Sequence, residues 1–405
     1  MKTTIKLAVA SALIAAASSA NAGIIIPAGD WTVDINGNVN AYFIHNRSSD
    51  NNTVLGGLAN TESGNADNNS SSSSINTGLL PSWLGVSGKT RQNDLDVGFT
   101  ISFQPGASGK TSLSAGAASN SEFRQASITF GDKSWGSIKI GKDLGVFGSD
   151  AILSDMTLLG VGSQGLVGTA GGTTTTLGRI GTGYLYADFN GQINYTSPNW
   201  NGFSFVAGID QPLNTLNLAG GASTASTGAQ KTPGFVGNVS YSWAGDVAGK
   251  VWAEAKTQNV EYGGTVGKER ATAFGIGAKV DVAGFGLVGY YYDADGVGTT
   301  AFLMDGVAAN GKSRDSDGGY VQATYTIPGV GTKLGVSWGI SKLDEASGEV
   351  ATTLVKENEM WTVGAYHPLT KHLNLVAEYS QVTAENHAGA ENESDIASVG
   401  AILFF

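Results

Sequence analysis

Long stretches of the chain alternate between apolar and polar residues with a period of two. From Trp31 to Phe43 the odd-numbered positions are mostly apolar and the even-numbered positions are mostly polar. The same alternation recurs at 95–103, 318–327, 332–341 and 359–367. Successive side chains of a β-strand point to opposite faces, so each stretch predicts a strand with one apolar and one polar face.

The alternation continues to the last residue of the chain. Chain ends are usually polar and loosely held, but this one reads SDIASVGAILFF. Leu403 and Phe405 fall on one face of the predicted strand, and Ser398 and Gly400 fall on the other. We therefore expect the final strand to be paired along its whole length.

The segments between these strands alternate in length. Short turns are expected at 91–94, 131–136, 198–202, 245–248, 282–285, 328–331 and 367–371. Long polar connections occupy the other positions, for example 46–81, 104–121 and 143–190. A water-soluble sandwich would also alternate, but it would bury its apolar face and rarely contains so many long strands.

Short turns at one end and long loops at the other are typical of an outer-membrane barrel. Eight long loops combined with seven short turns give about sixteen strands, with both chain ends on the periplasmic side. The barrel must close, because an open sheet edge in lipid would leave backbone groups unpaired. The predicted fold class is therefore all-β, a transmembrane antiparallel β-barrel with long extracellular loops.

The first 22 residues have the organisation of a secretory signal peptide. Lys2 and Lys6 supply positive charge, residues 7–17 are apolar but too short to span a bilayer, and Ala20-Asn21-Ala22 offers a cleavage site. We expect residues 1–22 to be removed and residues 23–405 to form a single barrel domain.

Composition supports this interpretation and excludes several classes. The 405 residues include 59 Gly, and only 14% are charged, so long helices are not expected. Removing a leader that contains two Lys and no acid changes the net charge from −11 to −13, which disfavours a nucleic-acid partner. The chain has no Cys, which excludes disulfides and thiolate metal sites.

The C-terminal residues resemble the assembly signal of Gram-negative outer-membrane proteins. The resemblance rests on polar Ser398, Gly400, apolar Leu403 and aromatic Phe405 at spacings of two, three and two. An aromatic ring is also favoured at a membrane interface, where the last strand would end. The resemblance implies that the barrel-assembly machinery recognises this strand and that the protein resides in the outer membrane.

Three further stretches resemble the general porins. Residues 123–142 are similar to the hairpin before the third loop, 149–156 and 178–203 to that loop and its return strand, and 363–380 to the penultimate hairpin. The resemblance implies a homotrimer of sixteen-stranded barrels, each with a water-filled pore narrowed by an inward-folded third loop. It also implies contact with outer-membrane lipids and lipopolysaccharide, and passage of small hydrophilic solutes.

The same resemblance indicates which residues would line the constriction. Asp150 and Asp155 match the acidic loop side, and the bases expected on the wall are Arg124, Lys142 and Arg179. Lys139 faces inward by parity if Ile138 and Ile140 face lipid. Trp83 occupies a position where the family often has Arg, which makes the basic cluster thinner and argues against strong anion preference.

Other signals for chemistry are weak. Residues 104–111 end like a phosphate-binding loop, but Gln104 occupies the first Gly position and no suitable helix follows. The four His are scattered without metal-ligand spacing, and His45 near Ser48 and Asp50 is a poor basis for an outer-membrane hydrolase. We therefore expect no enzyme activity, cofactor or metal. A porin with a preferred solute class, such as an organic acid or oligosaccharide, and a structural or adhesive barrel are the alternatives.

The charges assigned to the constriction generate a prediction about ion preference. We expect weak cation preference in dilute salt, because charges in a narrow passage are screened less than surface charges, for which the Debye length is about 10 Å at 0.1 M. Replacing both Asp150 and Asp155 by Asn should shift the zero-current potential toward anions, and replacing Lys142 and Arg179 by Gln should shift it the other way. Unchanged potentials in both variants, with conductance retained, would mean that the constriction has been misplaced.

Overall fold

The computed structural model describes residues 23–61, 70–107, 121–164, 174–219, 221–222, 230–263 and 266–405. The expected signal peptide, residues 1–22, lies outside the described residues. The described part of the chain is almost entirely β, with one short α-helix, α2 (Ser149–Ser154), and one 3₁₀ helix, η1 (Met156–Leu159). Neither of these helices is long and apolar enough to cross a membrane.

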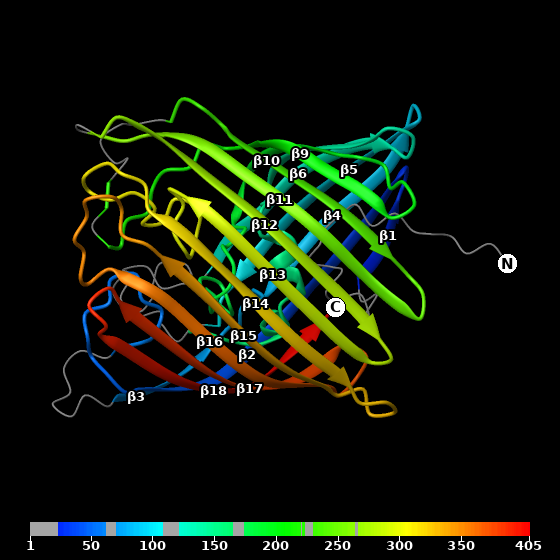
Figure 1. Cartoon of the computed structure of the whole chain (residues 1–405). Coiled ribbons are helices and arrows are strands. Elements are labelled where there is room, and N and C mark those ends of the chain that lie inside the picture. The colour runs from blue at the N-terminus through cyan, green and yellow to red at the C-terminus, as the bar shows by residue number, and fades with distance from the viewer. Residues whose placement is uncertain are drawn as a thin grey trace.

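Eighteen antiparallel strands form one sheet in the described residues. They are β1 (Ile24–Ala28), β2 (Trp31–Ser48), β3 (Ser70–Asn76), β4 (Trp83–Gln92), β5 (Leu95–Pro105), β6 (Ser121–Asp132), β7 (Gly136–Leu144), β8 (Phe189–Thr196), β9 (Phe203–Asp210), β10 (Gly234–Trp243), β11 (Val247–Glu261), β12 (Lys268–Val282), β13 (Phe285–Asp295), β14 (Asp315–Thr326), β15 (Lys333–Leu343), β16 (Val355–Pro368), β17 (Leu373–Asn386) and β18 (Glu391–Phe404). Sixteen of them, β2 and β4 to β18, form a closed ring, which confirms the predicted barrel (Figure 1).

The ring closes where the last strand meets the first long one. β18 pairs with β2 from Ser394↔Ser48 to Phe404↔Asn38. Beyond this ladder, Phe405 and Gly37 exchange two backbone hydrogen bonds of 3.0 and 2.8 Å. On the edge of β2 that pairs with β18, the first residues of β2 pair instead with β1. On the opposite edge, β4 pairs with the first part of β2 and β3 pairs with its last part. The seam is therefore paired to the last residue, as the C-terminal alternation predicted.

The short connections lie at one end of the barrel and the long loops at the other, as predicted (Figure 1). Two of the short turns contain only two residues, both with positive φ: Asn93 and Asp94 between β4 and β5, and Ala283 and Gly284 between β12 and β13. This conformation matches the right-handed twist of the flanking strands, and Asn, Asp and Gly adopt it most readily.

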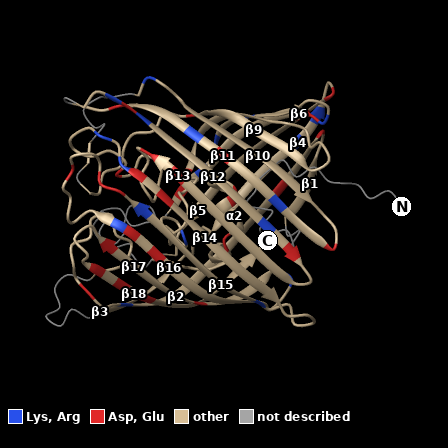
Figure 2. Ribbon diagram, viewed as in Figure 1, with Lys and Arg blue, Asp and Glu red and all other residues tan. Residues whose placement is uncertain are grey.

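The outer surface of the ring is apolar across its middle. Exposed side chains on this face include Phe43, Ile101, Phe274 and Leu287. Acidic residues gather toward the loop end of β13 to β18, where Figure 2 shows them as red bands. An apolar belt with charge restricted to its rim is the surface that a lipid bilayer requires.

The seam generates a prediction about assembly. The ring of Phe405 lies over Gly37, where an added Cβ would stand 2.8 Å from the ring. Replacing Phe405 by Ser, or deleting it, should lower the amount of assembled barrel in the outer membrane more than it changes pore conductance. Phe203→Ser, which removes an exposed aromatic ring at the start of β9 and away from the seam, is the matched control. Wild-type surface levels of the Phe405 variants would contradict an assembly role.

Candidate functional site

The connection between β7 and β8, residues 145–188, is here called the third loop. It carries α2 and η1 and contacts inward-facing side chains of the wall, so it lies inside the barrel. Figure 2 shows α2 within the ring of strands. The resemblance described above implied this inward fold, and the structure has it.

Buried wall side chains hold the backbone of the third loop in place. Glu378 on β17 accepts hydrogen bonds from the amides of Val161 and Gly162, at 2.7 and 3.0 Å. The hydroxyl of Tyr366 donates to the other oxygen of the same carboxylate at 2.6 Å. Glu254 on β11 likewise accepts from the amide of Gly148, at 3.0 Å. Two wall carboxylates therefore satisfy loop amides that no neighbouring strand pairs.

Neutral wall groups extend the same anchoring. Gln322 on β14 accepts from the amide of Met156 at 2.6 Å and donates to the carbonyl of Ser154 at 3.0 Å. The hydroxyl of Tyr320 donates to the carbonyl of Ala151 at 2.8 Å. On β2, the hydroxyl of Tyr42 donates to the carbonyl of Leu159 at 2.6 Å. The loop is thus fastened to strands from β11 round the ring to β2.

Apolar contacts support these hydrogen bonds. The inward faces of β2, β17 and β18 carry Ile44, Val382 and Ile396, all almost fully buried. They belong to one apolar cluster with Leu158 and Leu185 of the third loop. The inner face, which the sequence predicted to be polar, is therefore partly apolar. Its apolar residues are buried because the third loop packs against them.

Asp150 pairs with a base that sequence reasoning did not identify. Its carboxylate on α2 forms an ion pair with Lys250 on β11 and accepts a 3.1 Å hydrogen bond from Asn238 on β10. The predicted opposition of a loop acid and a wall base is present, but the base is Lys250. The sequence signal that could have identified Lys250 is its position on β11, where alternation places it on the inward face.

Arg179 does not lie on the wall, so that expectation is corrected. It belongs to the third loop, ten residues before β8 begins, and its side chain is fully buried. The guanidinium donates to the carbonyl of Met360 at 2.9 Å and to the hydroxyl of Ser337. It ties the loop to β15 and β16 because it can satisfy several acceptors at once.

Asp155 also occupies a buried position. Its carboxylate accepts hydrogen bonds from the amide of Thr157 at 2.9 Å and from the hydroxyl of Tyr184 at 2.9 Å. The first bond caps η1. Because only 4% of the residue is exposed, Asp155 organises the loop and presents little charge to the lumen.

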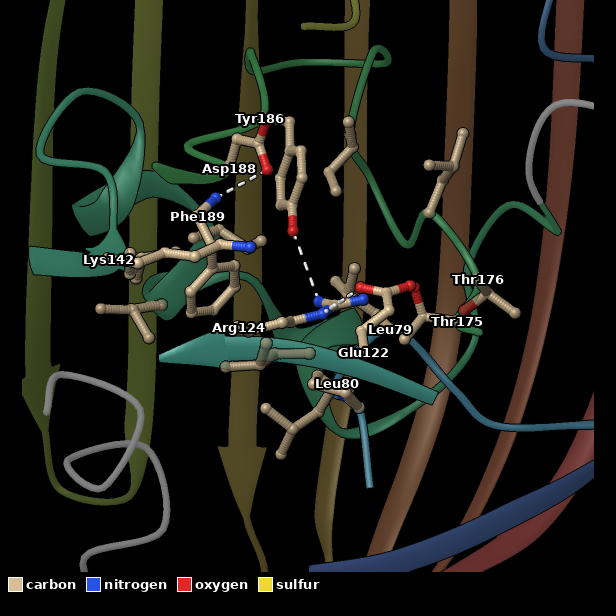
Figure 3. Close-up of a pocket in the computed structure, with 17 residues that line it drawn as sticks. Leu79, Leu80, Glu122, Arg124, Lys142, Thr175, Thr176, Tyr186, Asp188 and Phe189 are labelled. Carbon is tan, nitrogen blue, oxygen red and sulfur yellow. Dashed lines mark hydrogen bonds and ion pairs between the residues drawn. The ribbon is translucent and has the colours of Figure 1, made fainter. Parts of the chain in front are cut away.

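Arg124 lines a cavity of about 230 Å³ between the loop and β6 (Figure 3). Its guanidinium donates to Glu122 at 2.8 Å and lies 5.5 Å from the ring centroid of Phe189. The hydroxyl of Tyr186 points at it, at 3.4 Å. Leu79, Leu80, Ile152 and Leu158 form much of the remaining lining. This cavity has a charged side, which contains the predicted site residue Arg124, and an apolar side.

The other predicted residues are distributed as follows. Lys142 also lines this cavity, and its ammonium donates to the carbonyl of Phe123 at 2.9 Å. Lys139 faces inward, as its parity predicted, and pairs with Asp143 at 2.6 Å. Trp83 is buried at the start of β4, where its indole donates to Asn36 at 3.3 Å and contacts the ring of Phe404. The structure thus brings Arg124 and Lys142 together at this cavity, and it places Arg179 near Asp155 within the third loop.

The loops at the barrel mouth are joined by a residue that the sequence did not single out. Arg314 donates two hydrogen bonds to Glu349, at 2.6 and 2.9 Å, and one to the carbonyl of Asp305, at 2.8 Å. These bonds hold the pKa of Glu349 below its ordinary value. Asp305 accepts in turn from the amides of Leu218 and Ala219. Arg314 and Asp305 together therefore tie three loops to one another.

The weak signals for other chemistry find no support among the described residues. No group of three or more His, Asp or Glu side chains there is arranged to hold a metal ion. His45 bonds to Ser73 on β3, and Gln104 bonds to Ser102 within β5. Residues 108–111 of the apparent phosphate loop lie outside the described residues.

Comparison with known proteins finds similarity over nearly the whole chain. The family model described as Gram-negative porin matches residues 8–387. The outer-membrane channel DcaP of Acinetobacter baumannii has a similar fold, with a TM-score of 0.65 and 15% identity over 94% of this chain and 99% of that one. A comparison with curated protein sequences finds no match.

Two further solved structures share the fold. The anion-selective porin of Comamonas acidovorans has a TM-score of 0.61 and 15% identity, covering 93% of this chain and 100% of that one. OmpT of Vibrio cholerae in its trimer form has a TM-score of 0.55 and 16% identity, covering 93% and 99%. At this identity the likeness concerns the barrel architecture.

The anchoring of the third loop can be tested with Glu378. Glu378→Ala leaves two buried amides without an acceptor, at about 1–3 kcal/mol each, so the loop should loosen. We expect altered single-channel conductance and increased open-channel noise in planar bilayers. Glu385→Ala, on the same strand but paired outside with Lys356, is the matched control and should behave like wild type. Identical current records for both variants would show that Glu378 does not hold the loop.

Proposed function

The chain belongs to the Gram-negative porin family and forms an outer-membrane channel for passive solute diffusion, and we propose that its third loop determines which solutes pass. One observation carries this proposal: the loop lies within the barrel and is fastened to inward-facing groups on β11, β14, β17 and β2. A loop held this way narrows the lumen to a fixed width. Small hydrophilic solutes and ions would pass, and larger ones would be excluded.

Selection then depends on lumen width and on the charges beside the loop. Asp150 forms an ion pair with Lys250, and Glu122 forms one with Arg124, so these two acids beside the loop each have a base as partner. Of the residues assigned to the constriction, Lys142 has the exposed ammonium, whereas Arg179 and Asp155 are buried. We propose that Asp150, Lys250, Arg124 and Lys142 set the field, and that Arg179 and Asp155 maintain the shape of the loop.

This distinction refines the ion-preference prediction. Arg179→Gln should disturb the loop and so alter conductance and noise, in contrast to Lys142→Gln, which should mainly shift the zero-current potential. Reversal potential and conductance are measured on the same channels in a salt gradient. Two variants that shift the potential equally at unchanged conductance would contradict the structural role assigned to Arg179.

We propose that no catalysis accompanies passage. The family and fold are those of non-enzymatic channels. We also propose that residues 1–22 are cleaved after export, that residues 23–405 fold as one barrel, and that Ser398, Gly400, Leu403 and Phe405 direct its assembly. Outer-membrane lipids and lipopolysaccharide would surround its apolar belt.

A homotrimer is the proposed assembly. The apolar belt is broad enough for one part to contact lipid and another to contact neighbouring copies. OmpT of Vibrio cholerae, which shares this fold, has a trimer form. The purified protein should migrate as an SDS-resistant oligomer that collapses to monomer on boiling, because closed barrels are fully hydrogen-bonded. A monomeric band without heating, after gentle extraction, would count against the trimer.

Conductance in a planar bilayer separates this function from a structural or adhesive barrel. The purified full-length mature protein should give discrete steps of ion current that scale with salt concentration. A correctly folded barrel without such steps would overturn the channel proposal and favour adhesion by the long loops.

A further inference from the structure

We propose that a cavity on the periplasmic side of the third loop binds small organic monocarboxylates with a compact apolar body. The cavity is about 300 Å³ and lies between the loop and the turn ends of β12 to β15. It is distinct from the Arg124 cavity, which lies toward β6 and β7. This size is at the lower end of small-molecule sites, which span about 300–1,000 Å³. The inference rests on the proposed function and adds a solute class to it.

Two lysines supply the positive charge of this cavity. Lys279 on β12 faces inward and lies 3.6 Å from Asp281, and both side chains are about half exposed. Lys333 at the start of β15 forms no ion pair with the described residues; its ammonium lies 4.9 Å from the ring centroid of Tyr366. Four charged groups line the cavity, two lysines and the aspartates Asp155 and Asp281, so their formal charges balance. The carboxylate of Asp155 already accepts hydrogen bonds from Thr157 and Tyr184, whereas Lys333 has no ion-pair partner among the described residues.

The third loop supplies an apolar side. Leu153, Met156, Leu158 and Leu159 line the cavity from the loop. Gln322 also lines it, but both ends of its amide are occupied by the loop backbone. A solute would therefore meet the lysines and Asp281 on the wall and mainly apolar groups on the loop, where Asp155 is almost fully buried.

Gly286 on β13 keeps the cavity open. A Cβ added there would stand 2.7 Å from the hydroxyl of Thr324 and 3.0 Å from a carboxylate oxygen of Asp281. Both neighbours line the cavity. Any other residue at this position would place a side chain in the cavity and reduce the space beside the lysines.

These features select among solute classes. A monocarboxylate supplies one carboxylate that can pair with Lys333, and its apolar body can cover the leucines and the methionine. Inorganic phosphate would satisfy the charge but not the apolar side. A neutral alcohol of the same shape would leave Lys333 without a counter-ion.

Benzoate is a suitable probe for this site. The full-length channel is reconstituted in planar bilayers, and benzoate is added to the periplasmic side while current interruptions are recorded. Benzyl alcohol and inorganic phosphate at the same concentration are the comparison solutes. We expect benzoate to lengthen current interruptions, and neither comparison solute to do so to the same extent.

Variants locate the effect. Lys333→Gln and Lys279→Gln should each weaken the apparent benzoate affinity, by about fivefold for an ion pair of this exposure. Gly286→Ala should reduce the effect of benzoate while leaving both lysines in place. Lys89→Gln is the matched control, because Lys89 lies near the turn end of β4 across the ring from this cavity. Using two lysine variants keeps the test valid if one of them fails to fold.

The outcomes separate this inference from the proposed function. Salt conductance without any benzoate effect, an effect shared equally by benzyl alcohol or phosphate, or an effect unaltered by all three cavity variants would each overturn the site. Absence of salt conductance in the folded wild-type protein would instead overturn the channel itself. Loss of the benzoate effect in the lysine variants but not in Lys89→Gln would support the site.

Discussion

Every feature of this protein depends on the need to pair each backbone amide and carbonyl in a medium without water. A bilayer offers no hydrogen-bond partners, so the sheet must close on itself. Closure is made by β18 along β2 and completed by the two backbone bonds between Phe405 and Gly37. The apolar outer belt, the short turns and the displacement of irregular segments to one end or into the lumen all follow from this requirement.

The third loop meets the same requirement inside the barrel. Outside α2 and η1 its backbone is irregular, so its amides need acceptors other than a neighbouring strand. Glu254, Gln322 and Glu378 supply them from the wall, and the hydroxyls of Tyr42 and Tyr320 donate to loop carbonyls. Buried polar networks of this kind fix a single arrangement only when their members are satisfied. These loop-anchoring groups give the pore its shape, and they differ from Asp150, Lys250, Arg124 and Lys142, the groups proposed to present charge to a solute.

The charges near the loop are mostly arranged in pairs. Asp150 with Lys250 and Glu122 with Arg124 place opposite charges side by side, which limits the net field that an ion experiences. Lys333 differs, because it forms no ion pair with the described residues and its ammonium lies 4.9 Å from the ring centroid of Tyr366. An imbalance of this kind has more influence on a passing solute than the overall acidity of the chain, since distant surface charge is screened by salt.

The sequence alone determined the class of fold, because alternation with a period of two is a local property that each strand carries in its own residues. This alternation, together with the alternating lengths of the connections, predicted the turn positions, the number of strands and the paired C-terminus, and the cost of an open edge in lipid predicted that the sheet closes. The composition of the site could not. Asp150 meets Lys250, a hundred residues away, and Arg179 is buried against β15 and β16, because the path of a long loop decides these contacts. The inward apolar residues Ile44, Val382 and Ile396 likewise acquire their partners only when that loop enters the barrel.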